Sequence, residues 1–432
     1  MDSTQRLNGR TVLRFAHAFE SGGGTERYLD DLDRALLERN AMTVVRLHLT
    51  RRPVPAAPIE QKIGRGTLIC VPLAVTAGDR GSSRRELQES SLCFRLKQKF
   101  RDWVLYNPAV WGIIGATWTR RLTLPRQPGQ AIGAGRAAAQ QLQSRRIDLA
   151  ILHYFGGADA DEVLAAARAA GVPVGILNHY SNDRFLHLAI RKHAMAATGI
   201  AGVNGLGLPR YVRQGFANLS DGVDTDFFRR ALAATLPHPP RYPIILLPAR
   251  VVREKGQLDL VRAVSHLRKS GVECGIAFAG RVDSSEFVTE LKGEIAGAGM
   301  EDCVRFLGDL TVAQLRDWYA ACTIMAFPTY HHEGLGRVIV EAQAMETPVI
   351  AYATGGVAEA IEHGKTGYLL PTGDLAGLIR YLRELLLSPL RRAELGAAGR
   401  KVAEQRFSLA ALASRHEQFY AQVISDYRGG PR

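Results

Sequence analysis

The fold is decided by the stretch Phe327-Pro-Thr-Tyr-His-His-Glu-Gly-Leu-Gly-Arg-Val-Ile-Val-Glu341. It begins at the end of an apolar strand pattern, passes through a glycine turn and continues as a helix pattern. Apolar residues recur along that helix pattern at the spacing of one helical face, at Leu335, Val338, Ile339, Ala342 and Met345. A strand, a glycine turn and a helix in this order form the repeating unit of a parallel sheet covered by helices. The stretch therefore predicts an α/β fold.

The same alternation of apolar runs and helix patterns extends in both directions along the chain. It predicts nine strands, at residues 11–16, 42–47, 148–153, 173–178, 244–247, 274–279, 304–306, 323–327 and 348–352. They fall into two sets, separated by Leu236-Pro-His-Pro-Pro-Arg-Tyr-Pro243, whose prolines cannot continue a helix or a central strand. With 432 residues, the chain is also too long for one core of ordinary size. We therefore expect two domains, with a hinge near residues 221–243.

The composition is that of a folded globular chain. Hydrophobic residues make up 46% and charged residues 22%, which excludes general disorder. No apolar run reaches the roughly 18 residues that would cross a bilayer, and the N-terminal segment lacks the apolar core of a signal peptide. We therefore expect a cytoplasmic protein. The five cysteines are odd in number and form no Cys-x-x-Cys pair, which indicates reduced thiols and no metal site.

Positive charge is concentrated in one part of the chain. Residues 51–150 hold 17 Lys and Arg against 6 Asp and Glu, whereas the net charge of the whole chain is +13. The segment has no groove-reading helix, zinc finger or RNA-binding motif, so we expect no nucleic-acid partner. Residues 75–130 break the alternation of strands and helices, and residues 97–118 mix cations with Trp and other apolar side chains. This mixture fits an anionic membrane surface or a phosphorylated acceptor. The alternative is a helical insertion whose Trp residues fill a local core.

A glycine loop follows the first predicted strand. In Ser21-Gly-Gly-Gly-Thr-Glu26 it leads into a helix pattern. A strand, a glycine loop and a helix start together expose backbone N–H groups to an anion, so Gly23 and Gly24 are candidate phosphate contacts. The alternative is a flexible turn in which Thr25 caps the helix.

A basic turn follows the first strand of the second set. Pro248-Ala-Arg-Val-Val-Arg-Glu-Lys-Gly256 lies just past a buried strand, at the edge where open α/β sheets bind ligands. Arg250 and Lys255 are therefore candidates for a clamp on a diphosphate. The alternative is an exposed turn whose cations are only solvated.

Two carboxylates flank the glycine turn quoted first. Glu333 precedes the helix pattern, and Glu341 lies eight residues further, about 12 Å along a helix. Between them lie three residues whose N–H groups would face an anion, Gly334, Leu335 and Gly336. The glutamates could therefore reach opposite ends of a ligand whose phosphates the turn binds. The alternatives are an exposed pair of Glu341 with Arg337, and a Glu333 carboxylate favoured in the first helical turn by the helix dipole.

In combination, these features resemble the retaining glycosyltransferases of family 4, which have the GT-B fold. The matching segments are Gly22-Gly-Gly-Thr-Glu-Arg27, Asp221-Gly-Val-Asp-Thr-Asp-Phe227, the Ala249-Arg and Glu-Lys-Gly256 parts of the basic turn, Phe306-Leu-Gly308, the Glu333-Gly-Leu-Gly turn with Glu341, Thr347-Pro-Val-Ile350 and Gly355-Gly-Val-Ala-Glu359. They follow the family's order from residue 11 to about residue 425 and omit residues 55–145.

The resemblance implies a GT-B fold with two Rossmann-like domains that face each other across a cleft. Residues 1–225 would form the acceptor domain, with the basic insertion at about 75–130. Residues 226–405 would form the nucleotide-sugar donor domain, and a helix in residues 406–432 would pack back on the first domain.

The resemblance also implies roles for single residues. Arg250 and Lys255 would neutralise the donor diphosphate, so that no metal or other cofactor is needed. Glu333 would contact the transferred sugar near its reacting carbon, and Glu341 would bind the ribose hydroxyls. These roles make Glu333, Arg250 and Lys255 the expected catalytic residues of the second domain.

A histidine of the first domain is expected beside the donor sugar. His179, in Leu177-Asn-His-Tyr-Ser181, is the predicted catalytic histidine, and His153 is its rival. Arg281 and Val282 occupy the place of base contacts, although Gly280-Arg-Val-Asp283 stands where the family has Gly-x-Gly.

A second departure is Glu346, at a helix end where the family has glycine. Glycine readily takes the left-handed conformation that ends many helices, and glutamate does not. The substitution therefore raises a question about how that helix ends, and leaves the expected chemistry unchanged.

The sequence therefore predicts a retaining, metal-independent glycosyltransferase. It would move a sugar from a UDP- or GDP-linked donor to a glycan or lipid-linked acceptor, in the synthesis of a cell-surface polysaccharide, lipopolysaccharide or glycolipid. Its expected place is the cytoplasm, as a peripheral protein on the inner face of the cytoplasmic membrane. The alternatives are a sugar-nucleotide epimerase of the same fold and a non-catalytic, membrane-associated sugar-nucleotide binding subunit.

Overall fold

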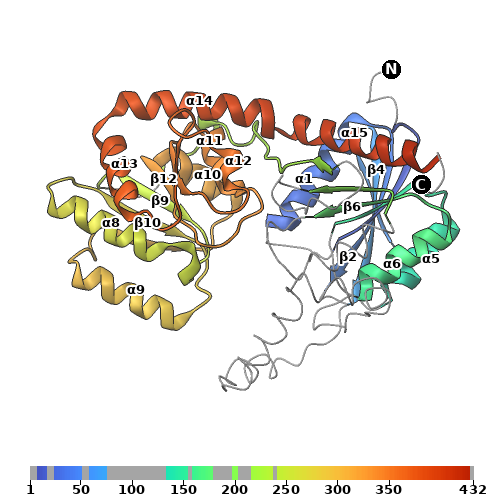
Figure 1. Ribbon diagram of the computed structural model, residues 1–432, viewed down its shortest axis with the longest axis horizontal. Helices are drawn as coiled ribbons and strands as arrows, with labels where there is room; N and C mark the ends of the chain where they lie inside the picture. The colour runs from blue at the N-terminus through green and yellow to red at the C-terminus, as the bar shows by residue number, and fades with distance from the viewer. Residues whose placement is uncertain are drawn as a thin grey trace, which may run out of the picture.

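Two sheets with helices on their faces organise the chain, one in each half (Figure 1). The computed structural model describes residues 7–16, 24–50, 58–74, 133–153, 158–178, 197–202, 216–236 and 241–428. The basic insertion at 75–130 and the candidates Gly23 and His179 lie outside these residues.

The first sheet has eight strands within the described residues, in the order β3-β4-β2-β1-β5-β6-β7-β8. Their bounds are β1 Thr11–Phe15, β2 Thr43–Thr50, β3 Ile59–Ile63, β4 Gly66–Ala74, β5 Leu149–Leu152, β6 Val174–Asn178, β7 Gly199–Gly202 and β8 Phe216–Asn218. Neighbours in this part of the chain are parallel except β3 and β4, which are antiparallel. Strand order reverses at the junction of β1 and β5.

Helices cover both faces of the first sheet. They are α1 Gly24–Arg39, α5 Ala134–Ser144, α6 Ala158–Ala169 and α15 Leu409–Arg428. Val12 of β1 belongs to the buried cluster with α1 and α15, whereas Leu13 and Phe15 belong to the cluster with α5 and α6. β1 is therefore buried on both faces, and its one charged residue, Arg14, is buried in an ion pair with Asp33 of α1.

The second sheet has six parallel strands in the order β11-β10-β9-β12-β13-β14. Their bounds are β9 Ile244–Pro248, β10 Gly275–Ala279, β11 Val304–Gly308, β12 Ile324–Phe327, β13 Val349–Tyr352 and β14 Tyr368–Leu370. The chain moves outward from β9 through β10 to β11, and then returns to the other side of β9. The order therefore reverses between β9 and β12, and such a reversal is where doubly wound sheets bind ligands.

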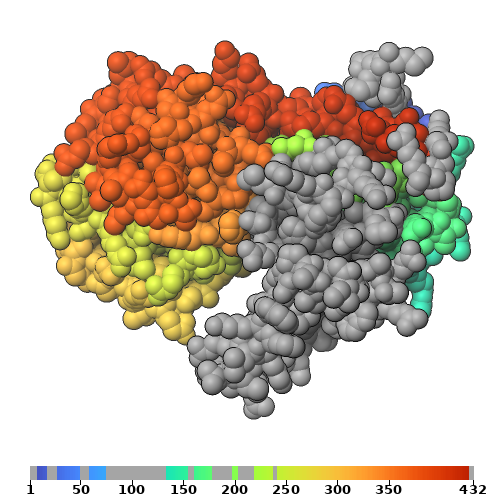
Figure 2. Space-filling view, in the orientation of Figure 1, coloured from blue at the N-terminus to red at the C-terminus, as the bar shows by residue number. Residues whose placement is uncertain are grey.

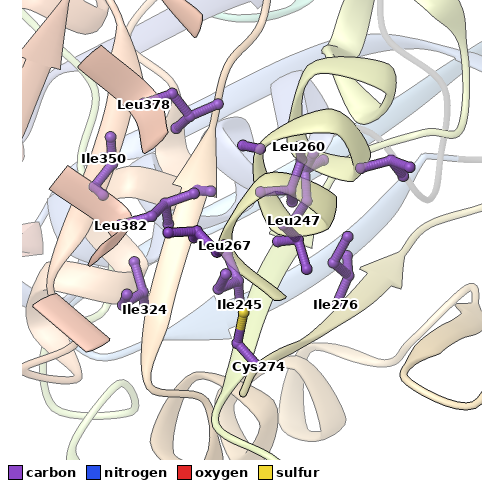
Figure 3. Close-up of a cluster of buried hydrophobic side chains, with 14 of the residues drawn as sticks. Ile245, Leu247, Leu260, Leu267, Cys274, Ile276, Ile324, Ile350, Leu378 and Leu382 are labelled. Carbon is purple, nitrogen blue, oxygen red and sulfur yellow. The ribbon is translucent and has the colours of Figure 1, made fainter. Parts of the chain in front are cut away.

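Helices also cover both faces of the second sheet. They are α8 Gln257–Lys269, α9 Ser285–Gly297, α10 Val312–Ala321, α11 Arg337–Ala344, α12 Val357–Ala360, α13 Leu375–Leu387 and α14 Pro389–Phe407, with 3-10 turns η2 Arg230–Leu232 and η3 Arg253–Lys255. Figure 3 shows the core on one face, where Leu260 of α8 and Leu378 of α13 pack over Ile245 and Ile350 of the sheet. On the other face, Trp318 of α10 and Ile339 of α11 are buried.

The last two helices connect the domains. α14 packs on α11 of the second domain, and α15 packs on α1 and on β5, β6 and β7 of the first. Figure 2 shows them as a red band that reaches from one domain to the other. Leu412 and Phe419 of α15 are buried in the first domain's core.

The predicted α/β fold with two parallel sheets is confirmed, and all nine predicted strands are present with ends shifted by a few residues. Five strands of the described residues were missed, namely β3, β4, β7, β8 and β14. Among the described helices, none combines the length and the apolar character that crossing a membrane requires.

Candidate active site

Two loops meet at the reversal point of the second sheet. The basic turn leaves the carboxyl end of β9, and the glycine turn leaves the carboxyl end of the adjacent β12. Because the strands are parallel, both loops emerge at the same edge. The carbonyl of Glu254 in the first loop accepts hydrogen bonds from the second loop, at 2.8 Å from the N–H of Tyr330 and 3.2 Å from Oγ1 of Thr329.

A glycine permits this close approach. Gly256 has a φ of +78° and caps α8, and a Cβ at this position would lie 1.9 Å from the carbonyl oxygen of Pro328. A side chain at residue 256 would therefore force the two loops apart.

The loops bring Lys255 and Glu333 into an ion pair. Nζ of Lys255 donates to Oε1 of Glu333, with 9% and 20% of the two side chains exposed. The alternative of a solvated cation is therefore wrong for Lys255. Glu333 lies four residues before α11 begins, so it is not the first-turn carboxylate of the other alternative. Its carbonyl accepts a 2.9 Å bond from the N–H of Gly356, which ties it to the loop after β13.

The glycine turn ends in the N-cap of α11. Gly336 has a φ of +77°, and no side chain caps the helix. Leu335 is buried beneath the turn, and Gly334 lies between it and Glu333. The start of α11 therefore has no capping side chain, and uncapped helix starts favour anions.

Arg250 has a separate partner. Its guanidinium donates to Asp283 at 2.6 Å and is 47% exposed, and Arg281 donates to the other oxygen of Asp283 at 2.7 Å. Burial alone would raise the pKa of the Asp283 carboxyl, but the hydrogen bonds from Arg250 and Arg281 lower it below the ordinary value. Val282 is half exposed beside them. The Asp283 carboxylate thus holds two cations together at the edge of the site, which sequence reasoning missed.

Glu341 is fully buried and contacts the other domain. Its Oε1 accepts a 3.1 Å bond from Arg27 of α1, and its Oε2 accepts a 3.0 Å bond from the Tyr319 hydroxyl. Burial and the nearby Glu341 raise the pKa of Tyr319, which keeps the hydroxyl a donor. The alternative of an exposed pair with Arg337 is wrong, because Arg337 instead contacts Asp31 at 2.6 Å and Asp221 at 2.9 Å.

His331 and His153 both lie in the described part of the chain. His331, two residues before Glu333, was missed, although the His-His-Glu sequence placed it there; burial and the nearby Lys255 lower its pKa. His153 directly follows β5 at the reversal point of the first sheet and is buried, with its ring 6.1 Å from that of Tyr28. His179 is outside the described residues, whereas Gly24 is the first residue of α1.

The structure thus brings together Lys255 with Glu333, and Arg250 with Arg281, and places Glu341 at the contact between the domains. In the described residues, no group of three or more His, Cys, Asp or Glu side chains is arranged to hold a metal ion.

Sequence comparison identifies a family model and curated relatives that match part of the chain. Residues 228–402 match the family model described as glycosyl transferases group 1. The D-inositol 3-phosphate glycosyltransferase 2 of Catenulispora acidiphila is 32% identical over 222 residues, which are 49% of this chain and 52% of the relative. The GDP-mannose-dependent alpha-(1-6)-phosphatidylinositol monomannoside mannosyltransferase of Mycolicibacterium smegmatis is 30% identical over 212 residues, 44% of this chain and 55% of the relative. The chain thus spans about half the length of the curated relatives it matches.

Structural comparison covers nearly the whole chain. A glycosyltransferase from Rickettsia africae aligns with a TM-score of 0.68 and 17% identity, over 96% of this chain and 99% of that one. HepE from Anabaena, in complex with UDP, aligns with a TM-score of 0.65 and 16% identity, over 94% and 98% of the two chains. At this level of identity the likeness concerns the fold alone. Residues 228–402 thus match the glycosyl transferases group 1 model, and they lie in the second half of a chain with the two-domain GT-B fold.

Proposed function

We propose that this chain is a retaining glycosyltransferase that moves a sugar from a UDP- or GDP-linked nucleotide sugar to an acceptor hydroxyl. The observation that carries the proposal is the Lys255–Glu333 ion pair, set beside an uncapped helix start at the reversal point of the second sheet. A diphosphate needs a cation and free N–H groups, and a sugar needs a carboxylate for its hydroxyls. The site offers a cation, a carboxylate and an uncapped helix start within one pair of loops.

The chemistry follows from where charge develops. As the bond between the sugar and the phosphate breaks, negative charge grows on the diphosphate, and positioned cations and N–H groups stabilise it. Lys255, Arg250 and the amides of residues 334–336 would supply this stabilisation, without a divalent metal. Glu333 would lie at the reacting sugar, with His179 or His153 approaching from the first domain. The leaving phosphate would accept the acceptor's proton on the same face, which gives retention.

The acceptor is proposed to be a glycan or a lipid-linked glycan bound by the first domain at the inner face of the cytoplasmic membrane. The Mycolicibacterium relative carries phosphatidylinositol monomannoside in its name, which supports a lipid-linked acceptor. The basic and aromatic composition of residues 97–118 supports contact with anionic lipid. Co-sedimentation with anionic but not neutral vesicles, weakened by salt, is the expected result.

The test combines binding with product analysis. A panel of UDP- and GDP-sugars is ranked by thermal shift, and the best donor is then incubated with and without a polyprenyl-linked sugar acceptor. A new glycoside that appears only with acceptor supports the proposal, whereas a changed or hydrolysed donor without acceptor supports an epimerase. Donor binding without turnover supports a non-catalytic subunit.

A variant and a chelator test the metal-free mechanism in the same assay. Lys255→Ala should lower turnover by at least about 10²-fold, the scale for loss of a preorganised charge. EDTA should have no effect. Activity lost in EDTA and restored by magnesium would refute the metal-independent part of the proposal.

A further inference from the structure

A stripe of alternating charge runs along one face of α1. It consists of Arg27, Asp31 and Arg34, whose i, i+4, i+7 spacing places them on the face opposite the apolar residues Leu32 and Leu36. Each residue of the stripe contacts the linker or the second domain: Arg27 with Glu341 at 3.1 Å, Asp31 with Arg337 at 2.6 Å, and Arg34 with Asp224 at 2.9 Å. The stripe therefore connects α1 to the linker and to the second domain.

Arg27 differs from the other two residues because its partner, Glu341, is fully buried. The Glu341 side chain has no exposed surface, and each of its oxygens accepts a hydrogen bond. Tyr319, on one oxygen, is fully buried as well, whereas the Arg27 side chain, on the other oxygen, is 31% exposed. The path from solvent to Glu341 therefore passes by the Arg27 guanidinium.

A ligand hydroxyl and a guanidinium interact with a carboxylate in the same way. Both are hydrogen-bond donors, and a carboxylate only accepts. A ligand hydroxyl that reaches Oε1 of Glu341 must therefore replace the Arg27 bond or share that oxygen with it.

We propose that Arg27 is a positioning residue that competes with the donor's ribose for Glu341. The inference rests on the proposed function, since it takes the ribose of a nucleotide sugar as the ligand. Nucleotide binding exchanges the Arg27–Glu341 bond for a bond from the ribose, so Arg27 lowers nucleotide affinity. By linkage, the bound nucleotide weakens the contact of α1 with α11 to the same extent. Donor occupancy is thus communicated to the first domain through one arginine.

The test measures binding of UDP and of GDP by calorimetry, on the full chain. In Arg27→Met the competitor is removed while the apolar stem is kept, and the nucleotide should bind about tenfold more tightly, the scale of one charge-assisted hydrogen bond. Arg27→Lys, which can still pair with Glu341, should bind as the wild type does. Arg27→Gln is a second neutral variant with the same expected direction, should the Met variant fail to fold.

Two controls separate competition from general loosening of the domain contact. Arg34→Met also removes a contact of the stripe but leaves Glu341 covered, so its affinity should stay within about twofold of the wild type. In a Glu341→Gln background, adding Arg27→Met should change affinity by less than about twofold, because the shared acceptor is already altered.

The outcomes separate this inference from the proposed function. Unchanged or weaker nucleotide binding in folded Arg27→Met and Arg27→Gln, in an enzyme that transfers sugar, overturns the competition alone. An equal gain in Arg34→Met also overturns it, because loosening would then be the cause. Binding of neither UDP nor GDP by any variant overturns the inference together with the proposed function.

Discussion

The close contact at Gly256 predicts that alanine destabilises the protein more there than at Gly271, the glycine after the other end of the same helix. Gly256 caps the start of α8 and Gly271 follows its end, and both have left-handed φ angles, +78° and +81°. Replacement by alanine at either position costs about 1 kcal/mol for the conformation alone. The two positions differ in their surroundings, because a Cβ at Gly271 would meet nothing within 4 Å, whereas one at Gly256 would lie 1.9 Å from the Pro328 carbonyl oxygen.

The expected loss in the free energy of unfolding follows from this difference in surroundings. Carbon and oxygen atoms in contact lie about 3.3 Å apart, so the loops that carry Lys255 and Glu333 would have to separate by more than about 1 Å. Forced repacking of this kind costs about 1–3 kcal/mol. We expect Gly256→Ala to lower the free energy of unfolding by about 2–4 kcal/mol, against about 1 kcal/mol for Gly271→Ala. A displacement of about 1 Å at reacting groups can also cost roughly 10² in rate.

The assay is urea unfolding of both variants beside the wild type, followed by kcat and KM with the best donor. Gly271→Ala should retain normal turnover, because it lies at the far end of α8. Equal destabilisation of the two variants, or normal turnover in Gly256→Ala, would show that the loops do not depend on their close approach.

Three further predictions concern single residues. Glu333→Gln should mainly lower kcat and Glu341→Gln should mainly raise the donor KM, because ribose contacts are made equally in the ground and transition states; near wild-type kinetics for Glu333→Gln would remove it from the chemistry. Glu346 has a φ of +58° at the end of α11, so Glu346→Gly should raise the midpoint of urea unfolding by relieving about 1 kcal/mol of strain; an unchanged or lower midpoint would contradict this. Burial and Lys255 lower the pKa of His331, and a diphosphate bound nearby would favour the imidazolium. Donor binding should therefore take up a proton and tighten as the pH falls toward the lowered pKa of His331, by at most about tenfold per pH unit. In calorimetry, the donor affinity of His331→Gln should depend less on pH than that of the wild type. An equal pH dependence would show that another group takes up the proton.

Apolar patterning was enough to predict most strands of both sheets, and two of the missed strands, β3 and β7, lacked it for physical reasons. β3 is an edge strand whose Glu60, Gln61 and Lys62 are exposed, so it has no buried face to leave a pattern. β7 is Gly-Ile-Ala-Gly, because α15 packs closely on it: a Cβ at Gly199 would lie 2.6 Å from a methyl of Val423. A short strand of small residues resembles a loop in sequence.

The candidate site likewise has residues that the sequence predicted and residues that it did not. Lys255 and Glu333 stand in local motifs next to predicted strand ends, so the sequence indicated both residues and the edge at which they meet. The partners of Glu341 were not predicted, since Arg27 is 314 residues away and Tyr319 belongs to a different helix. Only the packing of one domain on the other brings these groups together.

The packing of α15 has a consequence for the order in which the chain folds. α15 follows the second domain in the chain, yet it completes the core of the first. Tyr420 of α15 is fully buried there, and its hydroxyl accepts a 3.0 Å hydrogen bond from Arg14 of β1. During synthesis the second domain can close from consecutive residues, whereas the first must wait for a helix about 400 residues downstream of β1. Until then, the face of the first sheet that α15 covers is open to water, and a nascent chain needs protection from aggregation there. Truncation within α15 should therefore unfold the domain that was made first.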